Sequence, residues 1–175
     1  MNAIVSVTQD WGIGKDGNLA LSNRADMKRF VALTCAGRRP QETAPGEVLG
    51  TVLMGRTTYE SFPHGALKAR RNVVLSRDPH FAPTDAEVVR SIEDALEAIA
   101  SDDPQRVWLI GGESVYRQLL PHCTRVYVTK NEALCPADAF FPDLDADPSW
   151  HVVEHEEGGV TEEGVPFSYV TYERV

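Results

Sequence analysis

Three short segments of the chain combine the residue types that bind anions. Gly55–Thr58 follows one apolar run, Ser76-Arg77 follows a second, and Gly111-Gly112 follows a third. Glycine lets a ligand approach the backbone closely, and a helix that begins beside it offers free N–H groups. Arginine next to serine suits a phosphate on a ribose, and Arg90 follows further along. Three such segments at the ends of strands predict a dinucleotide ligand, in its 2′-phosphorylated form.

One carboxylate, Asp26, is the sharpest candidate for acid chemistry. It lies in the first turn of a helix predicted over 24–34, beside apolar residues such as Met27 and Phe30. Two roles are open. As part of a capping pair with Asn23, it would stabilise the helix by about 0.5–2 kcal/mol. As a partly desolvated carboxylate with a raised pKa, it would hold an amidine-like edge of a ligand through paired hydrogen bonds.

Two other patterns are misleading because of their spacing. Gly12–Gly17 matches the dinucleotide fingerprint Gly-x-Gly-x-x-Gly, but the next helix begins only near Arg24, so we expect a flexible loop that acts as a lid. His151 and His155 lie four residues apart on a predicted strand, roughly 13 Å from each other, and cannot share an ion. No metal site is predicted.

The candidate residues need a sheet that brings several strand ends together. Strands alternate with helices, which is typical of a mostly parallel sheet covered on both faces. We expect one α/β domain over residues 1–175, with an eight-stranded mixed, mostly parallel sheet and a C-terminal antiparallel hairpin. Capping boxes are predicted at Thr57/Glu60 and Ser91/Asp94. Strands are predicted at 3–7, within 48–54, and at 72–75, 87–89, 106–110, 125–129, 150–156 and 167–172; helices at 24–34, from 57, at 91–100 and from 113 to 120; and a long loop at 35–50.

Composition excludes several classes of function. The formal net charge of −9 argues against nucleic-acid binding. No apolar run approaches the roughly 18–20 residues of a membrane span, and the first residues lack the pattern of a signal peptide. The three cysteines are widely spaced, which fits neither a disulfide framework nor a zinc site. We expect a monomeric cytoplasmic protein with no nucleic-acid or membrane partner.

The motifs, in their order, resemble the dihydrofolate reductase family along nearly the whole chain. Each block is weakly specific alone, whereas the ordered set is highly specific. The resemblance implies the family's fold, NADPH as cofactor, and reduction of dihydrofolate to tetrahydrofolate by hydride transfer to C6 with protonation at N5, in support of one-carbon metabolism and thymidylate synthesis. The matching blocks are Gly12-Ile13-Gly14 with Gly17-Asn18-Leu19, Ala25–Phe30, Leu53–Ser61, Arg70–Arg77, Ile110–Gly112 with Val115-Tyr116, Val126–Thr129 and Phe140–Asp143.

The resemblance also implies roles for individual residues. Asp26, with Thr129 as its hydroxyl partner, is the catalytic acid that grips the pterin. Arg70 clamps the substrate's glutamate carboxylate, and Arg71 points elsewhere because neighbours on a strand face opposite ways. A cis peptide joins Gly111 and Gly112. The implied substrate-binding residues are Ile4, Val5, Asp26, Met27, Phe30, Phe62, Leu67, Arg70, Ile110, Tyr116 and Thr129; the implied cofactor-binding residues are Ser6, Ile13, Gly14, Asn18, Leu19, Gly55, Arg56, Thr57, Thr58, Leu75, Ser76, Arg77, Arg90, Ile110, Gly111, Gly112, Glu113, Ser114, Val115 and Tyr116.

Three features depart from the family pattern. Ala20-Leu21 replaces the usual Pro-Trp pair after Leu19, which removes an indole near the nicotinamide. Glu113 and Ser114 stand where many members carry glycine and arginine, so an acid lies near the cofactor phosphates. The 35–50 loop is longer than in compact members. The first two departures bear on loop closure and cofactor affinity.

Two rival functions also remain open. A pyrimidinone reductase of riboflavin synthesis shares the fold and the cofactor, but its ribityl-phosphate substrate has no use for the Asp26–Thr129 pair or for a carboxylate clamp at Arg70. A nucleotide-binding module without catalysis belongs to a different class, and the missing tryptophan and Glu113 are its only support. Oxidation of NADPH with and without dihydrofolate separates the three.

Overall fold

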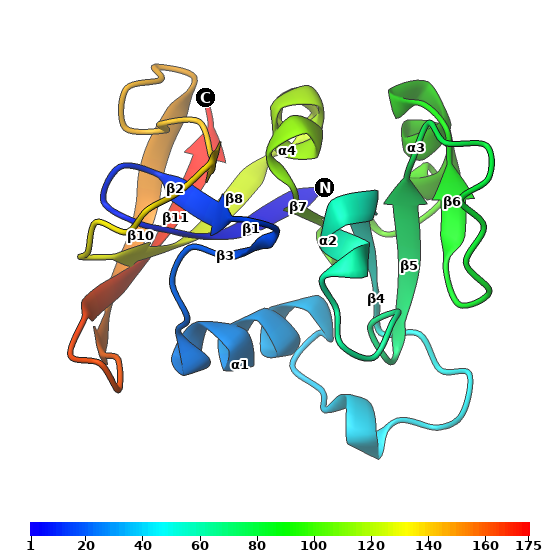
Figure 1. The fold of residues 1–175 in the computed structure, drawn as a ribbon, viewed down its shortest axis with the longest axis horizontal. Helices are drawn as coiled ribbons and strands as arrows, with labels where there is room; N and C mark the ends of the chain where they lie inside the picture. The colour runs from blue at the N-terminus through cyan, green and yellow to red at the C-terminus, as the bar shows by residue number, and fades with distance from the viewer.

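An eight-stranded sheet forms the centre of the computed structural model, which describes residues 1–175 (Figure 1). Its strand order is β10-β11-β8-β1-β7-β4-β5-β6. The strands from β8 to β6 pair in parallel, and β11 pairs antiparallel with both β8 and β10. The predicted mixed sheet with a C-terminal hairpin is confirmed. The strands are β1 (Asn2–Val7), β4 (Gly50–Gly55), β5 (Arg70–Leu75), β6 (Glu87–Val89), β7 (Val107–Gly111), β8 (Arg125–Asn131), β10 (Trp150–Val160) and β11 (Pro166–Arg174).

Helices cover both faces of this sheet, as the alternating pattern predicts. Helix α1 (Arg24–Thr34) packs on one face, and α3 (Ile92–Ile99) and α4 (Glu113–Leu119) pack on the other (Figure 1). Helix α2 (Arg56–Glu60) is a single short turn that continues β4. No helix in the structure has the length and apolar character that crossing a bilayer requires. Short 3₁₀ turns lie at Pro40–Glu42, Pro104–Arg106 and Leu120–His122.

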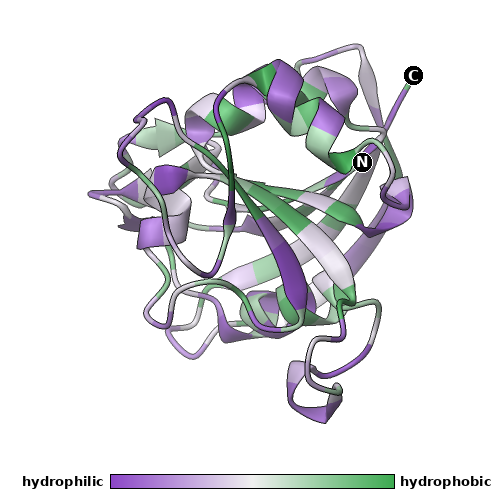
Figure 2. Cartoon of the chain, turned by 90° about the vertical axis from the view of Figure 1, so that its right-hand side faces the viewer, coloured by the Kyte–Doolittle hydropathy of each residue, from purple (hydrophilic) through white to green (hydrophobic).

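Apolar side chains divide into two unequal clusters, one on each face of the sheet. The larger cluster joins 24 buried residues and includes Leu119 of α4 and Ala95 of α3. The smaller cluster has only five buried members and is completed by half-buried side chains such as Phe30 of α1. Figure 2 shows the hydrophobic residues concentrated in the central strands and the hydrophilic ones in the loops. The α1 face is therefore the less densely filled side of the molecule.

The glycine-rich segment is a β-hairpin, which corrects the expected flexible loop. Strand β2 (Gly12–Lys15) pairs with β3 (Asn18–Leu19) and with β9 (Ala139–Phe140) in a separate three-stranded sheet. Asp16 and Gly17 connect the strands with φ angles of 51° and 80°. A two-residue turn with both φ angles positive matches strand twist, and Asp-Gly is a preferred sequence for it. The Asp-Gly pair was the available signal for this hairpin.

Two of the three predicted helix caps are confirmed. Asn23 caps α1 by accepting a hydrogen bond from the Asp26 backbone N–H, and Ser91 caps α3 by accepting one from that of Asp94. The expected box at Thr57 and Glu60 is wrong, because α2 begins one residue earlier and its N-cap, Gly55, has no side chain to offer. The Glu60 carboxylate pairs instead with Arg56, one turn back on the same helix.

Candidate active site

Asp26 faces the sheet, where a hydroxyl meets it. The Thr129 hydroxyl on β8 donates a 2.6 Å hydrogen bond to the Asp26 Oδ1, and both residues are buried. Burial raises the pKa of the Asp26 carboxyl, whereas the Thr129 hydrogen bond and the nearby Arg29 charge lower it. Because Asn23 supplies the helix cap, the Asp26 side chain is free of that role. Asp26 is an almost buried carboxylate whose second oxygen, Oδ2, has no donor within the chain.

A second buried contact holds the start of α1 against the same strand. The Asn23 amide donates a 2.9 Å hydrogen bond to the Asn131 Oδ1. The Asn131 amide in turn donates to the Ser6 hydroxyl at 2.9 Å and to the Val7 carbonyl at 3.0 Å. Thr129 and Asn131 are two residues apart on β8, so their side chains share one face. The two contacts together fix where Asp26 lies.

Apolar side chains from several elements extend from Asp26 across the α1 face. Phe30, one turn after Asp26, packs half-buried on the smaller cluster together with Phe62, Leu67 and Ile110. Met27 is 47% exposed although it is a large apolar side chain. These residues come from α1, from the segment after α2 and from β7. The face therefore carries apolar surface that the chain itself leaves partly uncovered.

Two adjacent arginines lie at the far end of this face and differ in their contacts. The Arg70 guanidinium donates to the Thr34 hydroxyl at 2.9 Å and lies 5.9 Å from the Phe30 ring centroid, and no acid pairs with it. Arg71 forms ion pairs with Glu87 and Asp102, each at 2.9 Å. The expected opposite orientation of the two side chains is therefore confirmed. Arg70 is the member with charge available to a ligand.

Several predicted residues contribute through the backbone or from the opposite face of the sheet. Ile4 belongs to the smaller cluster on the α1 face, but the Val5 side chain lies in the larger cluster with α4. The buried Tyr116 hydroxyl donates a 2.6 Å hydrogen bond to the Ile4 carbonyl, and burial raises the pKa of Tyr116. A ligand beside β1 can meet Val5 only through its main chain.

The three segments that the sequence predicts to bind anions lie next to one another. Strands β7, β4 and β5 are parallel neighbours, in which Gly55 is the register partner of Leu75 and Met54 that of Gly111. A Cβ at Gly55 would lie 2.9 Å from Val115 Cγ2, so only glycine allows α4 to approach this closely. The peptide between Gly111 and Gly112 is cis, as the resemblance implies.

The two helices that start at this edge lack a capping side chain. Neither α2 nor α4 has a side-chain hydrogen bond at its N-terminus, whereas α1 and α3 are both capped by a side chain. The first-turn N–H groups of a helix have no partner inside it. At α2 and α4 these donors remain open toward the edge where Gly55 and Gly111 end their strands. Bare helix starts beside glycines suit the phosphates of a dinucleotide.

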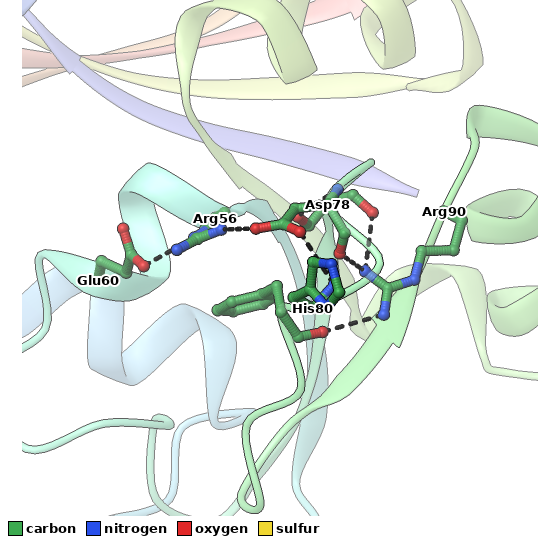
Figure 3. A network of polar contacts seen from close by, with 7 residues as sticks. Arg56, Glu60, Asp78, His80 and Arg90 are labelled. Atoms are coloured by element: carbon green, nitrogen blue, oxygen red, sulfur yellow. Dashed lines mark hydrogen bonds and ion pairs between the residues drawn. The ribbon is translucent and has the colours of Figure 1, made fainter.

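The arginines near this edge divide into paired and unpaired ones. Arg56 is held by Glu60 at 2.7 Å and Asp78 at 2.8 Å, and Arg90 donates to the carbonyls of residues 76, 78 and 81 (Figure 3). Asp78 thereby joins Arg56 to the Arg90 loop, and the His80 N–H, followed by Arg56, lowers the pKa of the Asp78 carboxyl. Arg77 is exposed, belongs to no ion pair and follows the buried Ser76.

The departures from the family pattern have local explanations. The Glu113 carboxylate pairs with Arg117 at 3.2 Å, one turn along α4, and the Ser114 hydroxyl accepts from Gln118. The unexpected acid at this helix start is thus partly balanced by its own helix. Leu21 is half-buried between β3 and α1, and Leu19 on β3 is 57% exposed. Ile13, Gly14 and Asn18 belong to the same hairpin.

Comparisons with known proteins agree with this geometry. The sequence model of the dihydrofolate reductase family matches residues 1–174. This chain belongs to the dihydrofolate reductase family. It is 34% identical to the dihydrofolate reductase of Bos taurus, with 99% of this chain and 97% of the relative covered. It is 32% identical to the bifunctional dihydrofolate reductase-thymidylate synthase of Glycine max, covering 98% of this chain but only 33% of that protein.

A solved member of the family has the same fold. The dihydrofolate reductase from Enterococcus faecalis, complexed with NADP(H) and RAB-propyl, superposes with a TM-score of 0.80 at 27% identity. The superposition covers 99% of this chain and 95% of that one. The eight-stranded sheet and its C-terminal hairpin are therefore those of the family.

Three residues with contacts at or near the candidate site carried weaker sequence signals. Asn131 follows Thr129 at the two-residue period of a strand face, which was the available hint that both contact α1. Asp78 lies within a Ser-Arg-Asp-Pro turn, where turn chemistry explains it without reference to the arginines on either side. Arg29 follows Asp26 by three residues, at helical spacing. The contacts of Asn131 with Asn23 and of Asp78 with Arg56 become visible only in the fold.

Proposed function

We propose that this chain reduces 7,8-dihydrofolate to 5,6,7,8-tetrahydrofolate with NADPH as cofactor. The observation that carries the proposal is the Asp26–Thr129 pair, a nearly buried carboxylate with one free oxygen, set beside an apolar face that is open to a ligand. The names of the relatives support the same reaction. The reaction would serve one-carbon metabolism and thymidylate synthesis.

Asp26 would bind the pterin ring of the substrate. Its ionised carboxylate would accept hydrogen bonds from the 2-amino group and the adjacent ring N–H, a paired charge-assisted arrangement. Thr129 would keep the carboxylate oriented through the 2.6 Å hydrogen bond to Oδ1. The polarised pterin would then gain its proton at N5 more readily, because electron density moves toward the ring atom that receives it. Apolar contacts to the rings of the substrate would come from Ile4, Met27, Phe30, Phe62, Leu67 and Ile110.

Arg70 would bind the glutamate carboxylate of the substrate. Its guanidinium is half-buried, is oriented by the Thr34 hydroxyl and has no acidic partner in the chain. A planar guanidinium suits a carboxylate because both can form two parallel hydrogen bonds. Arg71 is unsuitable for this role, since Glu87 and Asp102 already neutralise it.

The strand ends fit NADPH because the starts of α2 and α4 beside them are uncapped, which leaves backbone N–H groups for phosphates. The 2′-phosphate would be held by Ser76 and Arg77, and the adenosine would lie beside Leu75. The pyrophosphate would be held by Gly55, Thr57, Thr58, Gly111, Gly112, Ser114 and Val115. Bound there, the cofactor supplies the hydride for C6. Arg56, Arg90 and Glu113 would act mainly by fixing the loops and helix start around it.

The β2–β3 hairpin would cover the nicotinamide side and exclude water. The nicotinamide side would be lined by Ser6, Ile13, Gly14, Asn18, Leu19 and Tyr116. A closing segment of this kind protects a hydride transfer from solvent. With Leu21 in place of an aromatic ring, the seal near the hairpin would rest on aliphatic contacts.

We further propose that the protein acts as a monomer in the cytoplasm. All three cysteines are free thiols, and Cys35 and Cys123 are buried, which suits a reducing compartment. Sedimentation at the mass of one chain would agree with the monomer, and sedimentation at twice that mass would contradict it.

One assay separates this function from its rivals. The purified chain should oxidise NADPH only when dihydrofolate is present, and the product should be tetrahydrofolate. A pyrimidinone reductase would oxidise NADPH with a ribityl-phosphate pyrimidine and leave dihydrofolate untouched. Binding of NADPH without any turnover on either substrate would instead indicate a nucleotide-binding module.

A further inference from the structure

Beside the Asp26–Thr129 pair, a second side-chain contact joins the same helix to the next strand. Arg29 lies three residues after Asp26 on α1, so both side chains share one side of the helix. The Arg29 guanidinium carbon lies 3.9 Å from the centroid of the Tyr169 ring on β11. Tyr169 is the register partner of Thr129. The two contacts therefore lie next to each other, one through a hydroxyl and one through an aromatic face.

Arg29 differs from the other arginines that lie over rings, because Arg56, Arg70 and Arg174 also donate hydrogen bonds and Arg29 contacts only its ring. Arg24, Arg38 and Arg39 all pair with glutamates, whereas no carboxylate lies within ion-pair distance of Arg29. A guanidinium over an aromatic face keeps its full positive charge, because the ring quadrupole attracts the cation without neutralising it. That charge remains half-buried, where water screens it less than on the surface.

The other charged and titratable groups around Asp26 do not supply a competing cation. Strand β1 has none, and the neighbouring phenols of Tyr116 and Tyr169 are uncharged near neutral pH. Lys130 on β8 pairs with Asp145 and contacts the Trp11 and Tyr172 rings, on the other face of the sheet. Glu156 on β10 is the register partner of Tyr169 and adds negative charge; Arg24 on α1 is exposed and paired with Glu162.

We propose that Arg29, held over the Tyr169 ring, is a positioning residue that keeps the buried Asp26 carboxylate ionised and ready for the pterin. The proposal rests on the proposed function, in which Asp26 binds the pterin as an anion. Burial raises the pKa of Asp26, and the charge of Arg29 opposes that rise. Tyr169 holds the guanidinium close enough to Asp26 for its positive charge to lower the pKa of the carboxyl. A carboxylate in place of the ring would hold Arg29 as well but would cancel that charge.

The electrostatic part can be measured without substrate or cofactor. The Asp26 carboxyl carbon is observed by ¹³C NMR in aspartate-labelled enzyme, assigned by its loss in Asp26→Asn, and titrated with pH. Arg29→Leu should move the titration midpoint upward, and Arg29→Lys should restore most of the shift. Lys28→Gln is the matched control, since it removes a neighbouring charge that is exposed and two residues from Asp26, on another side of the helix. An unchanged midpoint in Arg29→Leu, or an equal shift in Lys28→Gln, would overturn the proposal.

The holding part is tested at Tyr169. Tyr169→Phe keeps an aromatic face and should leave the midpoint of Asp26 near that of the wild type. Tyr169→Leu removes the face, frees the guanidinium and should move the midpoint upward, though less than Arg29→Leu does. An effect of Tyr169→Phe equal to that of Tyr169→Leu would mean that the phenol, not the ring face, is responsible, and would overturn this part.

Turnover is measured separately so that two failures can be told apart. If dihydrofolate is not reduced by the wild type, the proposed function fails while the titrations still report on Arg29. If the wild type is active, the lower edge of its pH profile for substrate binding should move upward in Arg29→Leu and return in Arg29→Lys. A merely structural role for Arg29 would lower activity equally at every pH, which would overturn the proposal.

Discussion

The two oxygens of the Asp26 carboxylate differ in what surrounds them. Oδ1 accepts the Thr129 hydroxyl, and Oδ2 has no donor from the chain although the residue is only 9% exposed. Burial of this carboxylate penalises its charged form, which costs free energy in the ligand-free protein. Oδ2 is not sealed from solvent, so a ligand with two adjacent N–H groups can reach the carboxylate. At this residue, stability is lowered in favour of binding.

Asp26→Asn should therefore be less active and more stable at neutral pH. Turnover should fall by about 100-fold or more, a loss similar to that of a key electrostatic group. Because burial raises the pKa of Asp26, the native state binds the extra proton at pH values above the ordinary carboxyl range, so wild-type stability declines as pH rises through the raised pKa. The variant should exceed the wild type in free energy of unfolding by the largest amount above the raised pKa. That difference should disappear at pH values below the ordinary carboxyl range. Urea unfolding at several pH values measures it; equal stabilities at pH 8 would contradict the expectation.

Arg70→Ala should raise the Michaelis constant for dihydrofolate far more than it lowers turnover. Loss of charge-assisted hydrogen bonds to the glutamate costs about 1.5–3 kcal/mol, and the contact lies away from the reacting atoms. A pterin without a glutamate tail should be affected little. Arg71→Ala is the matched control, because it should reduce stability slightly through lost ion pairs and leave the Michaelis constant unchanged. Equal losses for tailed and tailless ligands would assign Arg70 to the fold.

Arg77→Ala should weaken the preference for NADPH over NADH. As an exposed arginine without an ion pair, it is free to bind the 2′-phosphate, and its loss should cost about 1–3 kcal/mol for NADPH alone. Arg117→Ala, which removes only the partner of Glu113, serves as a control with little effect on cofactor choice. Dissociation constants for both cofactors, measured by fluorescence, decide the matter. A wild type that binds both equally would disprove the assignment.

At the scale of elements, the start of α1 is held to the sheet by polar contacts. Asn23 both caps the helix and donates to Asn131, so one buried amide sets the helix start and its distance from β8. Helix α3 has a simpler start, where Ser91 caps without a contact to the sheet. The position of α1 is therefore linked to the candidate site, whereas the position of α3 is independent of it.

Asn131→Leu should destabilise the fold and impair substrate binding together. It leaves the buried Asn23 amide without its acceptor, at about 1–3 kcal/mol, and loosens the helix start that carries Asp26. Ser91→Ala should cost about 1 kcal/mol and leave the Michaelis constant for dihydrofolate unchanged. Urea unfolding and steady-state kinetics on both variants test this. Unaltered binding in Asn131→Leu would show that Thr129 alone places Asp26.

Local signals predicted the elements well wherever a single segment decided them. The bounds of α1 and β6 follow from apolar spacing and from capping, and the parallel sheet follows from alternation of strand and helix. The β2–β3 hairpin was misread because glycines dominated the pattern and β9, its third strand, is only two residues long. The helix start at Arg56 was misplaced because a strand that runs directly into a helix leaves no room for a capping residue.

At the scale of the whole molecule, strand order brings the site together. The sheet places β4 between β7 and β5, so three segments that are separated in sequence end side by side. Sequence predicted the three segments and the Asp26–Thr129 pairing, the latter only through a family resemblance. It could not predict that Asp78 would engage Arg56 or that Tyr169 would lie under Arg29, because such contacts depend on how distant loops and strands meet.

The unequal filling of the two faces has a consequence for local unfolding. The buried residues of α1 are the polar Asp26 and Thr34, and its apolar side chains are only half-covered. Amide hydrogens of α1 should thus exchange with solvent through local opening well before those of α4, which packs in the larger cluster. A ligand on the α1 face would slow that exchange, by about 2.7 kcal/mol of protection at a hundred times its dissociation constant. A bound folate would bury the apolar side chains that α1 leaves exposed. The amide exchange rates of α1 alone would therefore measure folate binding.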